Sequence, residues 1–385
     1  MADERRPKTM TLADQKKIRL SHLNFLESQG FKTYPAEPPL RTASNVVIRE
    51  RADEIIQSKE PIHSVGRITA IRDLGKIVFV RIDDGSGVGD GKEKQRGDLQ
   101  LMFSPKTDPR LLELWKGGGD IGDIISVSGP LTYSKTNELT IEVNEWGLLA
   151  KAFNPPPLNI GKHRVDTNAA RGKRYLELMA SSEARERFRT RSKIVQMMRE
   201  RFMQLGNLEV KTPVLDIFYG GAHANPFITK HKALDQAMYL RISNELYLKR
   251  LIVGMLSNGE GGVFEFSDDF RNEGMDSTHH PEFTQVELYM PYKDYNFMLE
   301  MTESLYREIV QKTKGKLQVD YQGKTIDFDN WRKVRIYDGL RDVLGINPRT
   351  ISSSDLINLA IQNGIKTDQE RGSILLELFE KIALP

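Results

Sequence analysis

The clearest alternation of apolar and polar residues lies at 263–290, where two short segments flank a loop rich in Gly, Pro and small polar residues. Period-two alternation is typical of strands with one buried face, so the sequence predicts two strands joined by a loop at 274–282. The polar face of the second strand carries Glu287 and Tyr289, and Arg271 belongs to the polar face of the first. This segment predicts the floor of a polar pocket, although a solvent-facing sheet surface would show the same alternation.

Short strands separated by turns dominate the pattern from 61 to 150. The alternation predicts five strands, with a helix at 109–115 between the third and the fourth. This order of elements is typical of an OB-fold barrel, which binds oligonucleotides through an open sheet face. The five predicted strands are 63–73, 76–84, 98–103, 124–134 and 138–149.

Helical spacing of apolar residues dominates the remainder of the chain. The pattern also predicts a β-hairpin at 319–328 that turns at Gln322 and Gly323. The predicted fold class is α+β, with a β-barrel followed by an antiparallel sheet with flanking helices. The predicted helices are 12–29, 48–58, 187–205, 241–256, 295–312, 354–363 and 372–382.

The change from helical to strand patterns suggests four parts. We expect an N-terminal helical extension at 1–60, a barrel at 61–150, a linker at 151–175 and a second domain at 176–385. The linker contains three consecutive prolines, which favour an extended chain.

Composition narrows the function only slightly. The 385 residues carry 56 basic and 53 acidic side chains, so a net charge of +3 does not demand a nucleic acid partner. The absence of cysteine excludes disulfides and thiolate metal sites. No segment resembles a membrane span or a secretory signal, so we expect a cytoplasmic protein without membrane contact.

Two glycine patterns do not predict nucleotide sites. The pattern at 117–122 matches G-x-G-x-x-G but lies between a predicted helix and a strand, whereas a dinucleotide fingerprint leaves a strand and opens a helix. Gly323 and Lys324 resemble the end of a P-loop, but Gln318 stands where its first glycine is required.

Several segments resemble class II aminoacyl-tRNA synthetases, and lysyl-tRNA synthetases in particular. The resemblance extends over 5–385, and the predicted barrel occupies the place of that family's anticodon-binding domain. FRNE at 270–273 followed by HHPEFTQVELY at 279–289 resembles motif 2, and LEVKTPVL at 208–215 resembles motif 1. The segments typical of lysyl-tRNA synthetases are RYLELM at 174–179, GGAHANPF at 220–227 and YLRISNELYLKRL at 239–251.

The resemblance implies a homodimer formed through motif 1 around Pro213. It implies an enzyme that activates L-lysine with ATP and Mg²⁺ to lysyl-adenylate and then esterifies tRNA(Lys).

The implied ATP site can be examined through its chemistry. Attack of a carboxylate on the α-phosphorus of ATP brings two anions together, and the fixed charge of Arg271 suits the space between them. By matched position, Arg271 is also the implied catalytic residue. The resemblance places Glu273 at the adenine amino group, Phe283 on the adenine ring and His279 at the terminal phosphates.

The implied lysine site uses residues from three segments. Gly221 and Glu245 match positions at the α-ammonium group, while Glu287 and Tyr289 match positions at the side-chain ammonium. A buried carboxylate beside a tyrosine hydroxyl suits a cation and would remain unpaired with a neutral substrate.

In the barrel, Phe79, Gln100 and Glu145 match positions that read anticodon bases by stacking and hydrogen bonding. Ordinary structural roles remain open for several of the implied residues. Phe79 could be a core aromatic of the barrel, Glu245 a first-turn helix acid and His279 an ordinary loop histidine.

The chain also departs from the family pattern. The third motif, which contributes an arginine to the terminal phosphates, is not found before residue 385, and neither are the acidic residues that bind Mg²⁺. We therefore expect no metal site within the chain, an incomplete catalytic domain and impaired activity of these residues alone. Smaller departures are Asn225, Thr278, the Ser243–Asn244 pair and an insertion at 257–262.

The sequence is also compatible with other functions. An aspartyl- or asparaginyl-type synthetase shares the architecture, but Glu287 and Tyr289 favour a cationic substrate. A protein-lysylating ligase would lack the barrel. A non-catalytic tRNA-binding paralogue would retain the barrel and lose amino-acid activation.

Overall fold

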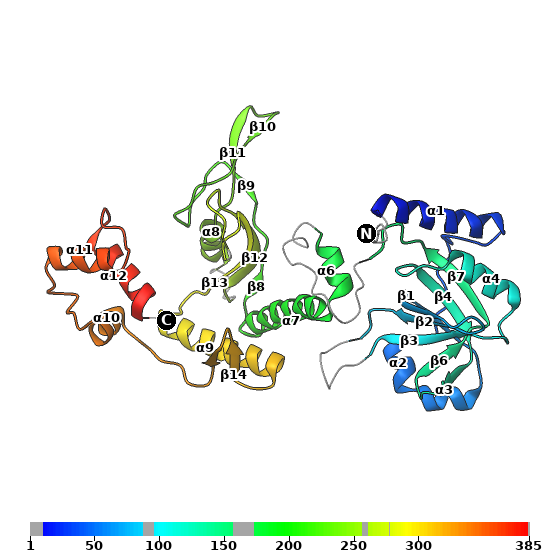
Figure 1. The fold of residues 1–385 in the computed structure, drawn as a ribbon. Coiled ribbons are helices and arrows are strands. Elements are labelled where there is room, and N and C mark those ends of the chain that lie inside the picture. Colours follow the sequence, from blue (N-terminus) through cyan, green and yellow to red (C-terminus); the bar gives the residue numbers. More distant parts are fainter. Residues whose placement is uncertain (1–10, 88–95, 157–172, 256–260, 277, 384–385) are drawn as a thin grey trace, which may run out of the picture. The chain divides into compact units, whose positions relative to one another are not determined.

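The computed structural model describes residues 11–87, 96–156, 173–255, 261–276 and 278–383. The chain divides into two compact units, Met1–Lys193 and Ile194–Pro385 (Figure 1). The first contains the barrel and the second contains the hairpin, so the predicted α+β class is confirmed. None of the helices in these ranges is both long and apolar enough to cross a bilayer.

The barrel is built from a seven-stranded sheet, in which only β3 and β6 pair in parallel. The predicted fourth and fifth strands are each divided into two. Pro130 interrupts the fourth because it has no N–H to donate, and its carbonyl instead accepts from Glu142 N at 3.0 Å. In the order β5-β6-β3-β2-β1-β4-β7, the sheet joins strands β1 (Ile62–Asp73), β2 (Val78–Asp83), β3 (Asp98–Phe103), β4 (Ile124–Gly129), β5 (Leu131–Tyr133), β6 (Leu139–Glu142) and β7 (Glu145–Ala150).

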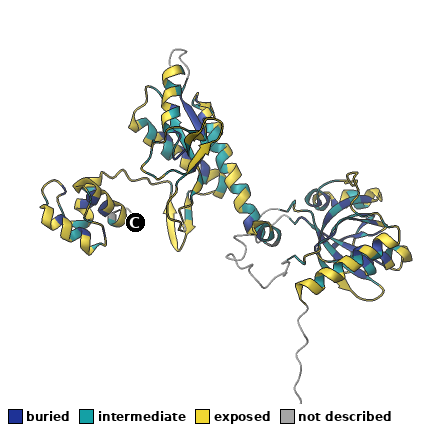
Figure 2. Cartoon of the chain, turned by 90° about the horizontal axis from the view of Figure 1, so that it is seen from above, coloured by how far each residue is buried: buried dark blue, intermediate teal, exposed yellow. Residues whose placement is uncertain are grey.

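Helices cover the barrel (Figure 2). Their apolar side chains join its core. Helix α4 (Pro109–Gly118) contributes Trp115, whose ring stacks on Phe103 at 4.7 Å. Helix α1 (Leu12–Ser28) contributes the fully buried Leu26. The predicted helix at 48–58 is two helices, α2 (Asn45–Glu50) and α3 (Ala52–Ser58).

A buried ion cluster attaches α1 and the end of β7 to the barrel. The Lys151 side chain is 0% exposed, and its Nζ donates to Asp123 Oδ2 at 2.8 Å and Asp120 Oδ2 at 2.5 Å. His22 of α1 lies 2.8 Å from the same Asp120 carboxylate. Burial would raise the pKa of Asp120, but the hydrogen bonds from Lys151 and His22 outweigh it and lower that pKa.

The second unit contains the predicted hairpin as β12 (Val263–Phe270) and β13 (Glu282–Tyr289), which pair antiparallel. The connecting loop is longer than predicted, because β12 ends before Arg271. The apolar face of the hairpin packs against α7 (Ser182–Gln204) and α9 (Tyr295–Lys314), with Phe264, Phe202 and Leu305 in the core. The opposite face is therefore left to polar residues.

The segment resembling motif 1 forms two strands of two residues each. Strand β8 (Leu208–Glu209) pairs with β12, and β9 (Leu215–Asp216) pairs with β11 (Gln236–Leu240). Between them Pro213 has no N–H, and Thr212 N donates to the Glu265 carboxylate at 3.1 Å. The break directs this segment to the polar face of β12.

The sequence did not predict α6 (Arg174–Ala180), α10 (Ile336–Leu344) or the antiparallel pair of β10 (Ile228–His231) and β11. The hairpin that turns at Gln322 and Gly323 is confirmed, with positive φ at both residues. Helix α10 shares an apolar cluster with the next two helices. The other elements are α8 (Glu245–Met255), β14 (Gln318–Tyr321), β15 (Lys324–Asp327), α11 (Ser353–Gln362), α12 (Arg371–Leu378) and a π-helix, η3 (Phe379–Ala383).

The proposed boundaries at 1–60, 61–150, 151–175 and 176–385 stay predictions. Residues 157–172, which make up most of the expected linker, lie outside the described residues. So do residues 257–260 of the expected insertion and residue 256 before it.

We expect the Lys151→Met variant to destabilise the first unit by about 3–5 kcal/mol, because it leaves the fully buried carboxylate of Asp123 without its cation. Urea unfolding followed by tryptophan fluorescence measures this, since Trp115 and Trp146 are buried in the barrel core. The control is Lys106→Met, whose side chain is 83% exposed and 3.9 Å from Glu142. A loss for Lys151→Met no larger than the control's would contradict the structural role of the cluster.

Candidate functional site

The floor of the candidate site is the polar face of β12 and β13. Glu265, Ser267 and Asp269 alternate along β12 and lie opposite Glu287, Gln285 and Phe283 of β13. All three β12 residues are buried. A sheet surface facing solvent would expose them, so the pocket interpretation is supported.

Glu265 connects this floor to the segment resembling motif 1. Its carboxylate accepts from Thr212 Oγ1 at 2.7 Å, Arg241 Nη1 at 3.0 Å and Asn244 Nδ2 at 3.0 Å. Burial would raise the pKa of Glu265, but the hydrogen bonds from Asn244 and Thr212 and the charge of Arg241 lower it. Glu265 is therefore an anion in the folded protein at neutral pH.

Asp269 adds a second buried carboxylate, with Oδ1 3.2 Å from Arg241 Nε. The side chain is 0% exposed, and neither oxygen has a hydrogen-bond partner among the described atoms. Burial raises the pKa of Asp269, and the positive charge of Arg241 opposes the shift. Asp269 lies two residues before Arg271 on the same polar face, and the sequence pattern assigned it no role.

The four residues expected at lysine converge at the N-terminal end of α8. Glu287 accepts from Tyr289 Oη and from Ser243 Oγ, each at 2.9 Å. Ser243 Oγ also accepts from Glu245 N at 3.1 Å. Gly221 lies against the same group, because a Cβ there would be 2.8 Å from Ser243 Oγ and 3.0 Å from Glu245 Cβ.

The environment of Tyr289 favours its neutral form. Burial raises the pKa of the Tyr289 hydroxyl, and the bond that it donates to Glu287 raises it further. The hydroxyl therefore stays a donor at neutral pH and holds the Glu287 carboxylate in place. Glu287 also accepts from Gln285, so its orientation is fixed by several donors.

The four residues expected at ATP line one cavity of about 790 Å³. The Arg271 guanidinium lies 5.0 Å from the centre of the Phe283 ring, and Arg271 Nε donates to Ile242 O at 3.4 Å. Glu273 accepts from Asn225 N at 3.3 Å. The remaining expected residue, His279, lies in the loop between the strands.

That loop is organised by Asp276. Its carboxylate accepts from the amides of Thr278 and His279 at 2.7 and 2.8 Å, and these bonds, with the neighbouring His279 ring, lower the pKa of Asp276. The His279 side chain is 74% exposed. It therefore remains accessible to a ligand in the cavity.

In the barrel, two of the three expected RNA contacts lie close together. Phe79 points outward from β2, opposite Met102 of β3, while Gln100 lies opposite Arg81 on the same two strands. Phe79 is only partly buried whereas its neighbours Val78 and Val80 are 1% exposed, so it is not a core aromatic.

Glu145 begins β7, which the sheet order separates from β2 by β1 and β4. Its side chain is exposed. The preceding chain lies beside β3, because Val143 N donates to Met102 O at 3.0 Å.

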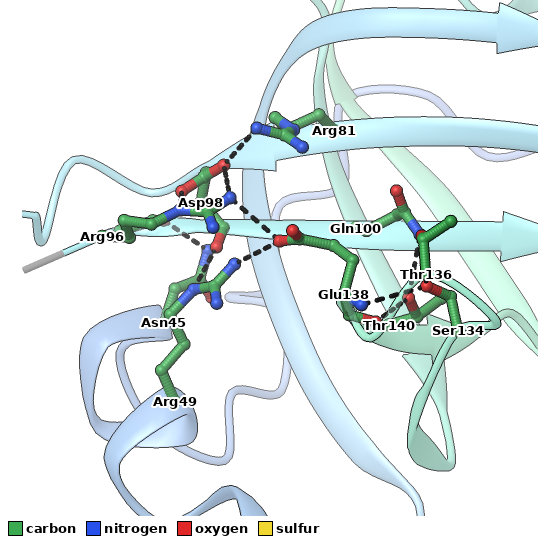
Figure 3. Close-up of polar contacts among 11 residues, drawn as sticks. Asn45, Arg49, Arg81, Arg96, Asp98, Gln100, Ser134, Thr136, Glu138 and Thr140 are labelled. Carbon is green, nitrogen blue, oxygen red and sulfur yellow. Dashed lines mark hydrogen bonds and ion pairs between the residues drawn. The ribbon is translucent and has the colours of Figure 1, made fainter.

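An ion cluster fixes the barrel face next to Gln100 (Figure 3). Asp98 accepts from Arg96 through both carboxylate oxygens at 3.0 Å and lies 3.0 Å from Arg81. Glu138 joins Arg96 to Arg49 of α2. Gln100 Nε2 donates to Thr140 Oγ1 at 2.9 Å, so its amide is oriented by the neighbouring strand.

The sequence did not identify the buried residues Arg241, Asn244, Thr212 and Glu265 as part of the site. A signal was present, because Glu265 continues the period-two polar face of the hairpin toward its N-terminal end. The partner Arg241 could not be found in this way, since its position depends on how α8 and β12 pack.

Comparisons with known proteins agree with these features. The model of the family "tRNA synthetases class II (D, K and N)" matches residues 166–381, and that of the "OB-fold nucleic acid binding domain" matches 64–149. A lysine–tRNA ligase of Thermotoga maritima is 37% identical over 95% of this chain and 71% of its own length. One from Chloroflexus aurantiacus is 36% identical over 98% of this chain and 74% of its own length.

A third relative, the lysine–tRNA ligase of Thermotoga sp. strain RQ2, is 40% identical over 87% of this chain. The chain spans 65% of that relative, so it covers about two thirds to three quarters of the length of these three proteins.

We expect Glu265→Gln to destabilise the second unit by about 3 kcal/mol at pH 7, because a buried arginine loses its main carboxylate. The lowered pKa of Glu265 means that its contribution is present above its ordinary pKa of 4.5 and is lost as the pH falls through the folded-state pKa. The difference from the wild type should be constant from pH 7 to about 5 and then shrink. Native-state hydrogen exchange at β12 amides measures both effects.

The matched control is Glu209→Gln, which breaks the exposed pair with Arg199 at 2.7 Å. This change should cost less than about 1 kcal/mol. Equal losses of stability from the two substitutions would contradict the proposed structural role of Glu265.

Proposed function

Since the chain belongs to the lysine–tRNA ligases of the class II tRNA synthetases, we propose that it activates L-lysine with ATP to lysyl-adenylate and esterifies tRNA(Lys) with the product. The observation that carries the proposal is the Glu287 carboxylate, held by Ser243 and Tyr289 at one end of a sheet face whose other end forms the cavity around Arg271.

In the proposed reaction a lysine carboxylate oxygen attacks the α-phosphorus of ATP, and the bond to pyrophosphate breaks. Arg271 would lie between the two anions and reduce their repulsion. Phe283 would stack on adenine, Glu273 would accept from its amino group, and His279 would contact the terminal phosphates. The protein would act by positioning and charge, without a covalent intermediate.

Lysine selectivity would come from the paired carboxylates. Glu287 and Tyr289 would receive the side-chain ammonium, and Glu245 and Gly221 would receive the α-ammonium. The negative charge of Glu287 opposes an aspartate side chain, and the Glu287 carboxylate would remain without a cationic partner beside a neutral asparagine side chain.

Mg²⁺ would accompany ATP as its phosphate complex. Among the described residues no group of three His, Asp or Glu side chains could hold a metal ion, so we assign no step to a metal held by them.

We propose that the barrel binds the anticodon of tRNA(Lys), with Phe79 stacking on a base and Gln100 and Glu145 forming hydrogen bonds to base edges. The outward position of Phe79 next to Gln100 supports this role. A protein of this function would work in the cytoplasm, where tRNA is aminoacylated.

We also propose a homodimer formed through the region around Pro213. Several large apolar side chains in and near this region are exposed, and such side chains favour burial against a protein partner. They are Leu208, Leu215, Ile217, Phe218, Tyr219 and Ile228, which are 42–69% exposed.

Glu287→Gln should weaken lysine binding by roughly 100-fold or more, because the substrate ammonium loses its charged partner. ATP–pyrophosphate exchange with lysine, aspartate or asparagine tests this, together with calorimetric lysine binding. The exposed Glu300→Gln should behave as the wild type. Exchange that depends on aspartate or asparagine, or lysine binding unchanged by Glu287→Gln, would refute the assignment.

For the dimer, Phe218→Asp combined with Ile228→Asp should yield monomers in sedimentation velocity at concentrations where the wild type is dimeric. Tyr292→Asp is the control, since Tyr292 is 92% exposed outside this region. A wild type that sediments as a monomer contradicts the proposal.

A further inference from the structure

A second cavity, of about 710 Å³, lies at the beginning of α10. Arg335, Arg341 and Arg349 line it, together with Tyr337 and Asp338. It shares no lining residue with the cavity around Arg271. None of the roles proposed above uses these side chains.

The wall that carries Arg349 is fixed by hydrogen bonds. Asn347 O accepts from Thr350 N at 3.1 Å and Ile351 N at 2.9 Å. Arg371 Nη2 donates to Pro348 O at 3.0 Å and to Ile351 O at 2.9 Å. The cavity is therefore preformed, and a ligand would not have to order this loop.

The charges around the cavity do not balance. Arg341 pairs with Asp338 at 2.9 Å and with Asp342 at 3.5 Å, whereas Arg335 and Arg349 form no ion pair with any carboxylate in the described ranges. Arg332 and Lys333 precede them in the chain and add positive charge. This local excess favours an anionic ligand.

Arg335 does not stabilise helix α10. It precedes the first residue of α10 and forms no side-chain capping hydrogen bond. A cation at this end of a helix opposes the helix dipole, and arginine is not a preferred capping residue. A residue that breaks a local rule without a gain in stability is expected at a functional site.

Tyr337 adds an aromatic surface to the arginines. Its side chain is 44% exposed, and the Arg349 guanidinium lies 5.7 Å from its ring centre. An exposed tyrosine beside arginines can contact a base or ribose while the arginines contact phosphates. A free phosphate ion would use the arginines alone.

We propose that this cavity binds phosphate groups of the RNA backbone and so forms an RNA contact additional to the barrel. Arg335 and Arg349 supply the principal charges, and Tyr337 packs against the nucleotide between them. The identity of the RNA as tRNA(Lys) rests on the proposed function, while the affinity for phosphate groups follows from the arginines.

The test is the double variant Arg335→Gln with Arg349→Gln. Neither side chain forms an ion pair with the residues that the structure describes, so the fold should be retained, as circular dichroism can verify. Filter binding of tRNA(Lys) between 50 and 300 mM salt should show affinity reduced about 10-fold or more near 100 mM, and a log–log salt slope shallower by about 1–2. Lysine binding measured by calorimetry should be unchanged.

The matched control is Lys366→Gln with Lys324→Gln, which removes two exposed charges outside the cavity. It should alter affinity less than about 3-fold and leave the slope nearly constant. Equal losses from the control and the arginine variant would overturn the proposal, as would unchanged RNA binding by the arginine variant. Tyr337→Leu should weaken RNA binding without changing the salt slope.

Titration with inorganic phosphate separates the two possible sources of the anion. Phosphate binding that is lost in the arginine variant while RNA affinity stays constant would overturn the assignment to RNA. If the wild type does not bind lysine but RNA binding still responds to Arg335 and Arg349, the proposed function fails and this inference stands.

Discussion

The candidate site depends on one buried carboxylate. Glu265 receives hydrogen bonds from Thr212 in one segment and from Arg241 and Asn244 in a second segment, just before α8. A buried anion requires such donors, because an unpaired charge in the interior is very costly. The pairing therefore fixes how the segment around Pro213 and the start of α8 lie on β12, and hence where Gly221, Glu245 and Glu287 meet. The positions expected at lysine are a consequence of this packing.

The barrel also contains a buried charge that is paired with groups from distant segments. Lys151 is buried between Asp120 and Asp123, and His22 brings α1 to the same group. Apolar packing alone would allow the helix to shift along the barrel, whereas paired buried charges specify one arrangement. The face that carries Phe79 and Gln100 is fixed in turn by arginine–carboxylate pairs on the exterior (Figure 3). In both units, oriented polar side chains lie next to fixed ion pairs.

The residues that depart from the family pattern form hydrogen bonds that orient neighbouring groups of the site. Ser243 orients Glu287 and accepts from the Glu245 amide, while Asn244 contributes to the anchor at Glu265. Thr278 helps Asp276 to fold the loop that carries His279, and Asn225 contacts Glu273 through its backbone. The main chain of Asn225 thus contacts the loop after β12, because Asn225 O also accepts from Asn272 N at 2.8 Å.

The sequence by itself determined the barrel, the hairpin and its two faces, because period-two alternation and turn residues are local signals. It also identified the residues that match family motifs. It did not determine the break of the segment at 208–215, the existence of α10 or the roles of Arg241 and Glu265. Those depend on partners distant in sequence: Thr212 leaves the sheet pattern to bond Glu265, and α10 is stabilised by apolar contacts with later helices. Only the tertiary structure decided them, because long-range burial sets the energy of a charge or of a short helix.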